Sequence, residues 1–240
     1  MMIIDRARAW GGVLTPTLVG NQRTRVLVGL QLPLTLLLLA LVPGGWAKLV
    51  GFLLCWALTF SAITRQDLVI YVVVSALFSL MDIMAVQQGV FRFNSPDYLG
   101  LPVWEFFMWG FYVLHCLRFL GGPAPRTSRL AAAALAVLFA VPFVTLSDPW
   151  LLLVASGSAL AVALSFYHDR RDLAYLGYMV VLGALVEYCG VWSGQWHYPG
   201  DPVGGVPLWF ATMWGGIGLF TRRLILPFVR TGPSPLGGPA

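Results

Sequence analysis

The stretch from Met81 to Gly110, MDIMAVQQGVFRFNSPDYLGLPVWEFFMWG, has a second, diverged copy later in the same chain. A shift of 105 positions, without a gap, places Asp82 on Glu187, so that an acid matches an acid inside an apolar segment. Other matched pairs follow at the same offset: Gly89 with Gly194, Phe91 with Trp196, Phe93 with Tyr198, Gly100 with Gly205, Pro102 with Pro207, Trp104 with Trp209, Met108 with Met213, Trp109 with Trp214 and Gly110 with Gly215. This ungapped series indicates an internal duplication.

The duplication extends beyond this stretch. Three further pairs keep the offset: Arg65 with Arg170, Asp67 with Asp172 and Arg118 with Arg223. We therefore expect a single membrane domain over residues 1–240, with repeat one at 26–120 and repeat two at 131–225. The last ten residues, 231–240, are rich in Pro, Gly and Ser and are expected to be a disordered tail.

Composition predicts an all-α membrane protein. Hydrophobic residues make up 58% of the chain and charged residues 10%, against roughly 25% charged in soluble domains. Continuous apolar runs recur at about the length that crosses a hydrocarbon core about 30 Å thick, and their lack of alternation favours helices over a barrel. We expect a polytopic bundle of about eight spans in two tandem parallel repeats: Val26–Val42, Trp46–Ile63, Leu68–Gln88, Pro102–Leu120, Leu130–Leu146, Trp150–Tyr167, Leu173–Gly190 and Val206–Phe228.

The basic residues predict the orientation. If both termini are cytoplasmic, thirteen arginines lie on the inner side, and only Lys48 and Arg92 lie outside. Anionic lipid head groups then account for the net charge of +5, and no nucleic-acid partner is expected. Four spans per repeat make the two halves parallel. We expect an integral protein of the plasma membrane with both termini in the cytoplasm.

Three acids lie inside predicted spans: Asp82, Glu105 and Glu187. A charged carboxyl group facing lipid costs a few kcal/mol, so these side chains should face the bundle interior. They are either structural acids with hydrogen-bonded partners or the catalytic groups of one shared cavity near the outer side. The remaining acids are interpreted as solvated charges beside arginines (Asp67, Asp169, Asp172) or as turn residues (Asp97, Asp148, Asp201).

Aromatic residues gather on the same side of the predicted membrane. An interfacial aromatic belt explains such crowding, but inward-facing rings beside acids could instead surround an apolar substrate and stabilise a cation. The candidate substrate-binding rings are Trp104, Trp109, Trp209, Trp214, Phe91, Trp196 and Tyr198. On the span that holds Glu187, Gly183 and Gly190 share one helix face, which favours close contact with a neighbouring helix.

Signals for other chemistry are missing from the sequence. Cys55, Cys116 and Cys189 have no disulfide or metal-ligand spacing, and no two histidines have metal-ligand spacing. The chain has neither a glycine-rich phosphate loop nor a serine nucleophile motif. We expect neither a metal ion nor another cofactor; a divalent ion held by the acids stays open as an alternative.

The motifs around the first acid resemble a known family. Asp82, the segment GVFRF at Gly89–Phe93 and the segment LGLPVWEFF at Leu99–Phe107 are similar to the lycopene cyclase domain of small membrane proteins in carotenoid biosynthesis. That family is built from tandem repeats and cyclises a polyene without net redox chemistry. Where the family has two adjacent carboxylates, this chain has Trp104-Glu105, and its second copy has Trp209-Phe210.

The resemblance implies an integral-membrane isoprenoid cyclase that acts by protonating an alkene. Glu105 matches the family's acid motif and is the expected proton donor, with Asp82 or Glu187 orienting it or removing a proton from the final cation. The expected partners are an isoprenoid or polyene substrate and membrane lipids. The residues leave three alternatives open: a hydratase acting on isoprenoids, a transporter or lipid-binding protein with intramembrane acids, and an assembly subunit with an aromatic binding face.

Overall fold

The computed structural model of the protein describes residues 22–60, 63–126, 128–200 and 203–228. These residues form eight α-helices: α2 (Gln22–Leu41), α3 (Gly45–Thr59), α4 (Arg65–Gln87), α5 (Glu105–Leu120), α6 (Arg129–Thr145), α7 (Pro149–Phe166), α8 (Arg170–Trp192) and α9 (Trp209–Phe220). Short helical turns continue α9 through Phe228, and a further turn, Val203–Gly205, precedes it. The predicted all-α class is confirmed, and each predicted span overlaps one helix. The predicted disordered tail lies outside the described residues.

Within the described residues, three helices are long and apolar enough to cross a membrane: α4, α7 and α8. Helices α2, α3 and α6 are also apolar but shorter. On α4, Leu68, Val72 and Leu80 are each more than half exposed, so the helix presents an apolar outer face. Extended apolar surface of this kind is rare on soluble monomers and suits contact with lipid.

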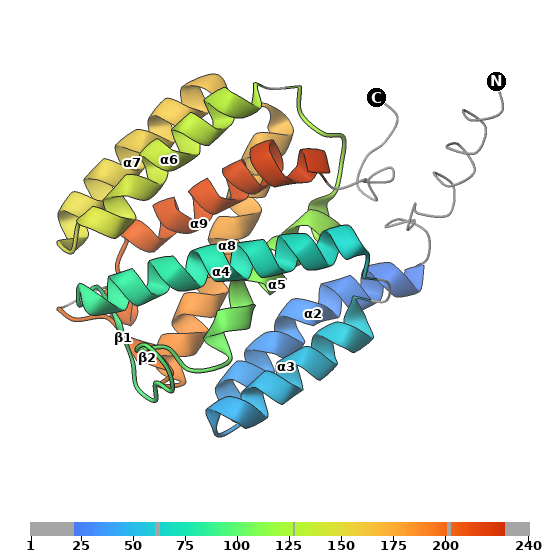
Figure 1. Cartoon of the computed structure of the whole chain (residues 1–240), viewed down its shortest axis with the longest axis vertical. Coiled ribbons are helices and arrows are strands. Elements are labelled where there is room, and N and C mark those ends of the chain that lie inside the picture. Colours follow the sequence, from blue (N-terminus) through green and yellow to red (C-terminus); the bar gives the residue numbers. More distant parts are fainter. Residues whose placement is uncertain (1–21, 61–62, 127, 201–202, 229–240) are drawn as a thin grey trace.

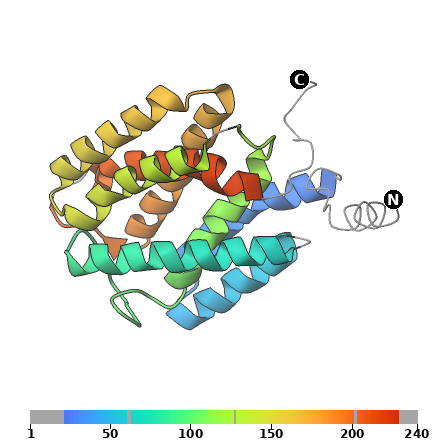
Figure 2. The same ribbon diagram turned by 45° about the horizontal axis from the view of Figure 1, so that its top comes forward.

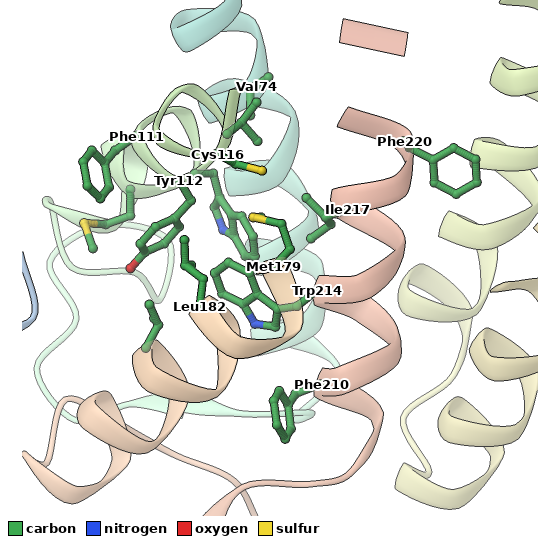
Figure 3. Close-up of a cluster of buried hydrophobic side chains, with 14 of the residues drawn as sticks. Val74, Phe111, Tyr112, Cys116, Met179, Leu182, Phe210, Trp214, Ile217 and Phe220 are labelled. Carbon is green, nitrogen blue, oxygen red and sulfur yellow. The ribbon is translucent and has the colours of Figure 1, made fainter. Parts of the chain in front are cut away.

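Four helices form the centre of the bundle. Figures 1 and 2 show the α2–α3 pair and the α6–α7 pair on opposite sides of α4, α5, α8 and α9. Glycines allow the central helices to approach closely: a Cβ atom on Gly110 would lie 2.6 Å from the backbone oxygen of Tyr71, and one on Gly218 would overlap the backbone of Tyr175. Figure 3 shows Trp214 of α9 in the core beside Met179 of α8.

Helix boundaries recur along the chain at the offset found in the sequence. Both ends of α8 lie 105 residues after the ends of α4, and α6 and α7 follow α2 and α3 at nearly the same spacing. The N-termini of α4 and α8 are also built alike. Each begins with a capping box, closed by Asp67 in α4 and by Asp172 in α8.

The same two aspartates form buried ion pairs with the C-terminal arginines of the partner helices. Asp67 pairs with Arg118 at 2.9 Å, and Asp172 pairs with Arg222 and Arg223. We call this end of the bundle the arginine end. The interpretation of Asp67 and Asp172 as solvated charges was wrong, because α5 and α9 end over these helix N-termini and cover the carboxylates, which are 5% and 0% exposed.

Asp169, the N-cap of α8, keeps half of its side chain exposed, as predicted for a charge at the surface. Burial works against its ionisation, but the backbone N–H of Asp172 and the Arg222 guanidinium outweigh that effect and lower the pKa of the Asp169 carboxyl. Two predicted turn residues also cap backbone groups. Asp148 accepts from the backbone N–H groups that open α7, and Asp97 accepts from Val103 N at 2.9 Å. Asp201 lies outside the described residues.

The loops that follow α4 and α8 meet at the opposite end of the bundle. Strand β1 (Arg92–Phe93) pairs antiparallel with β2 (Trp196–His197), and Phe93 lies opposite Trp196. Asn94 strengthens the contact by donating to the Gly194 oxygen at 2.8 Å. We call this the strand end; the two loops close the bundle there, directly over the layer of acids.

Candidate functional site

The three predicted acids line one cavity of about 50 Å³ at the strand end. Asp82 comes from the last turns of α4, Glu105 is the first residue of α5, and Glu187 lies in the last third of α8. Glu105 and Glu187 are buried, and Asp82 is partly buried. The structure therefore brings together the three carboxyl groups that the sequence singled out.

The carboxyl groups of Asp82 and Glu105 are neighbours in this cavity. Since a carboxylate only accepts hydrogen bonds, a direct bond between the two requires a proton on one of them. Asp82 Oδ2 also accepts a hydrogen bond from Trp109 Nε1 at 2.6 Å.

Glu187 is held differently, by three donors. Trp196 Nε1 at 3.1 Å and Tyr198 Oη at 2.7 Å donate to Oε2, while Trp214 Nε1 at 3.0 Å donates to Oε1. These bonds supply both carboxylate oxygens with partners and fix the side chain against the cavity wall. Glu187 is thus a fully partnered acid beside the Asp82–Glu105 pair.

The offset of 105 residues relates the two acid sites. Trp109 donates to Asp82 as Trp214 donates to Glu187, and the two indoles lie against each other with ring centroids 4.8 Å apart. The sites differ in their remaining partners. Phe91 and Phe93 stand 105 positions before Trp196 and Tyr198, and a phenylalanine has no hydrogen-bond donor for Asp82.

Two of the indole rings that donate to Glu187 pack against glycines of α8. A Cβ atom on Gly183 would overlap the ring of Trp214, and one on Gly190 would overlap the ring of Trp196. The sequence prediction gave these glycines a role in close contact between helices. The structure shows that the space they leave is filled by indole rings, one turn of helix on either side of Glu187.

We expect Gly183→Ala to destabilise the protein by about 1–3 kcal/mol, because the added methyl group overpacks the site and displaces Trp214 from Glu187. The matched control is Gly177→Ala on the same helix, where a Cβ atom meets nothing within 4 Å. That change should be neutral or stabilise by up to about 1 kcal/mol. Thermal unfolding of the purified proteins in detergent measures both changes in stability. Equal changes in unfolding temperature for the two variants would contradict the packing of Trp214 against Gly183.

Aromatic rings wall the cavity. Six of the seven predicted rings line it: Phe91, Trp109, Trp196, Tyr198, Trp209 and Trp214. The seventh, Trp104, packs behind the wall against Phe93 and Trp196, with Lys48 Nζ 5.9 Å from its ring.

Four further lining residues were not predicted: Phe93, Tyr112, Val186 and Met213. Helical spacing was a usable signal for Tyr112, which follows Glu105 by seven residues and Trp109 by three and so shares their helix face. Val186 and Met213 carry no such chemical signal.

The site is an aromatic-walled acid pocket. The described part of the chain contains no group of three or more His, Cys, Asp or Glu side chains arranged to hold a metal ion. The chemistry available from its side chains is proton transfer and stabilisation of positive charge by ring faces and carboxylates. Comparison of the chain with protein-family models, with curated proteins and with solved structures finds no match.

Proposed function

We propose that this protein is an integral-membrane enzyme that protonates an alkene of an isoprenoid and so starts a non-redox cyclisation. The observation that supports this most is the placement of two neighbouring carboxyl groups, Asp82 and Glu105, inside one aromatic-walled cavity. An alkene is a very weak base, so its protonation needs an acid that is positioned beside the carbon and shielded from water. A buried carboxylic acid meets that need.

The hydrogen bonds favour Glu105 as the protonated member of the pair. Asp82 accepts from Trp109, and donors to a carboxylate stabilise its ionised form. Glu105 lies beside the Asp82 carboxylate, which can accept a hydrogen bond from a protonated Glu105. Glu105 is also the acid without a counterpart, since its position in the second copy holds Phe210.

The proposed reaction balances within the pocket. Glu105 gives its proton to one carbon of the alkene, and the cation that forms on the other carbon is attacked by the π electrons of a second alkene to close the ring. Asp82 then removes a proton from a carbon beside the final cation, which yields an isomer of the substrate. The pair then exchanges this proton with water, which leaves Glu105 protonated for the next turnover. Ring faces of Trp109, Trp209 and Trp214 stabilise the cation, each by about 1–2 kcal/mol when desolvated.

We further propose that the bundle is a duplicated unit of four spans, with eight spans in total and both termini on the cytoplasmic side of the plasma membrane. Matching helix boundaries, capping boxes, ion pairs and indole–acid bonds at the same offset support the duplication. The clustering of arginines at one end supports the placement of that end in the cytoplasm.

Cysteine labelling tests this topology. In intact cells, a membrane-impermeant maleimide should label Ser95→Cys in the exposed loop of the strand end but not Ala124→Cys in the exposed loop between α5 and α6. Both positions should react after the cells are opened. Labelling of Ala124→Cys alone in intact cells would reverse the orientation, and labelling of both would contradict a membrane between them.

The function is tested with lipid extracts from cells that contain or lack the gene, in a host that supplies several linear isoprenoids. Mass spectrometry should show a new species with the mass of one supplied isoprenoid and a different retention time. A product heavier by one water would identify hydration instead. Redistribution of an unchanged isoprenoid between membrane and medium would support transport, and unchanged extracts with folded protein in the membrane would contradict the proposal.

A further inference from the structure

A second cavity, much larger than the acid pocket, opens on the side of the bundle. It is an apolar groove of about 640 Å³ between α4, α6 and α9, a volume within the range of small-molecule sites. Along α4 it runs from Arg65 to Met81, sixteen residues or about 24 Å of helix. Its polar lining residues, Arg65, Gln66 and Thr221, belong to the arginine end, and the rest of its wall is hydrophobic.

The groove reaches the acid pocket. Met213 lines both cavities, so they are adjacent at this side chain. Phe78 of the groove wall stacks on Trp109 with ring centroids 4.7 Å apart, and Trp109 is the donor to Asp82. A chain lying in the groove would therefore have one end beside the Asp82–Glu105 pair.

Several side chains of the groove are smaller than their counterparts at the equivalent interface of the other half. There, between α2, α5 and α8, His115 bonds Gln31 at 2.9 Å and Tyr178 at 2.5 Å, and Phe119 stacks on Tyr178. The same offset places a smaller residue at four groove positions: Ala136 for Gln31, Val73 for Tyr178, Ile217 for Tyr112 and Leu224 for Phe119. One interface is filled by side chains, and its counterpart leaves room for a ligand.

We propose that this groove holds the apolar chain of the isoprenoid substrate, with its reacting end past Met213 at the acid pair; the assignment rests on the proposed function. An extended carbon chain advances roughly 1.2 Å per bond, so the groove accepts on the order of twenty bonds. A linear prenyl chain of four to five isoprene units has that length. The acid pocket, at about 50 Å³, takes only the end of such a chain.

Ala136→Trp tests the groove, with geranylgeraniol, a linear prenyl alcohol of four isoprene units, as the probe. Native mass spectrometry of the detergent-purified full chain should show one bound probe for the unmodified protein, and binding at least tenfold weaker for Ala136→Trp. The matched control is Val137→Trp on the same helix, because Val137 is 65% exposed and does not line the groove. If Ala136→Trp does not fold, Val73→Tyr, which installs the residue of the equivalent position, replaces it, with Val72→Tyr as control.

Equal binding by unmodified protein and the groove variants would overturn the proposal. Retention of phosphatidylcholine in the groove in the presence of excess geranylgeraniol would also overturn the proposal, because the groove would then be a site for membrane lipid. Glu105→Gln separates this proposal from the proposed function: it should lose product formation but keep most of the probe binding, since the groove that holds the chain has no carboxyl group among its described lining residues. If probe binding depends on Ala136 but the lipid extracts are unchanged, the groove is a prenyl-chain site and the proposed cyclase activity is rejected.

Discussion

Glu105→Gln is expected to lower turnover by about 10²–10⁴-fold while the protein stays folded. Glutamine keeps the size of the side chain and still bonds the Asp82 carboxylate, but it has no acidic proton to give to an alkene. Membranes are given the substrate found in the extracts, and mass spectrometry measures the product formed per milligram of membrane protein. The two amounts give the ratio of turnover between the variant and the unmodified protein. Thermal unfolding in detergent shows whether the variant remains folded.

Asp148→Asn is a matched control for the loss of one carboxylate. Asp148 is the exposed N-cap of α7, far in the sequence from the acid pocket, and asparagine caps helices about as well as aspartate. Its activity and unfolding temperature should stay unchanged. Full activity of a folded Glu105→Gln protein would remove Glu105 from the chemistry and favour the transport interpretation.

Asp172→Asn is expected to lower the free energy of unfolding by about 3–5 kcal/mol, the second large effect. Asp172 is fully buried between Arg222 and Arg223, which are themselves buried, so its neutralisation removes the buried one of their two counter-charges. The acid pocket lies at the other end of α8 and should keep its geometry. Chemical unfolding in detergent measures the loss of stability.

Asp169→Asn is the control, because Asp169 also bonds both arginines but has 51% of its side chain exposed. Its replacement should cost less than about 1 kcal/mol, since exposed ion pairs contribute little and asparagine remains a good N-cap. The lowered pKa of Asp169 means that its contribution is present at neutral pH and is lost as pH falls through that lowered value. Similar losses for the two variants would contradict the buried ion-pair account.

The sequence predicted the helices and the convergence of acids because both depend on local signals. Apolar runs set the helix positions, and the ungapped match of Asp82 with Glu187 placed the two acids at the same depth. The burial of Asp172 was missed, since an acid beside Arg170 and Arg171 has the same local pattern whether or not a distant helix end covers it. The match of Arg118 with Arg223 was the available signal for those ion pairs.

The different hydrogen-bond partners of the acids depend on contacts between segments that are distant in the chain. Sequence shows aromatic residues at both loop positions, but the strand pairing determines that Trp196 and Tyr198 point at Glu187. At the offset of 105 positions Phe93 matches Tyr198 and lacks its hydroxyl donor, and that difference is visible in the sequence. The groove could not be predicted in the same way, because its width is set by how α6 packs against two helices distant in the chain.

The most direct test of the central claim is the isotope content of the product formed in D₂O. Membranes containing the protein are equilibrated in D₂O and given the linear isoprenoid that the lipid extracts identify. If a carboxylic acid of the pocket protonates the alkene, each product molecule gains one deuterium at carbon, while the product formed in H₂O has the mass of the substrate. A cyclised product without deuterium, formed at the same rate by Glu105→Gln, would contradict protonation by Glu105.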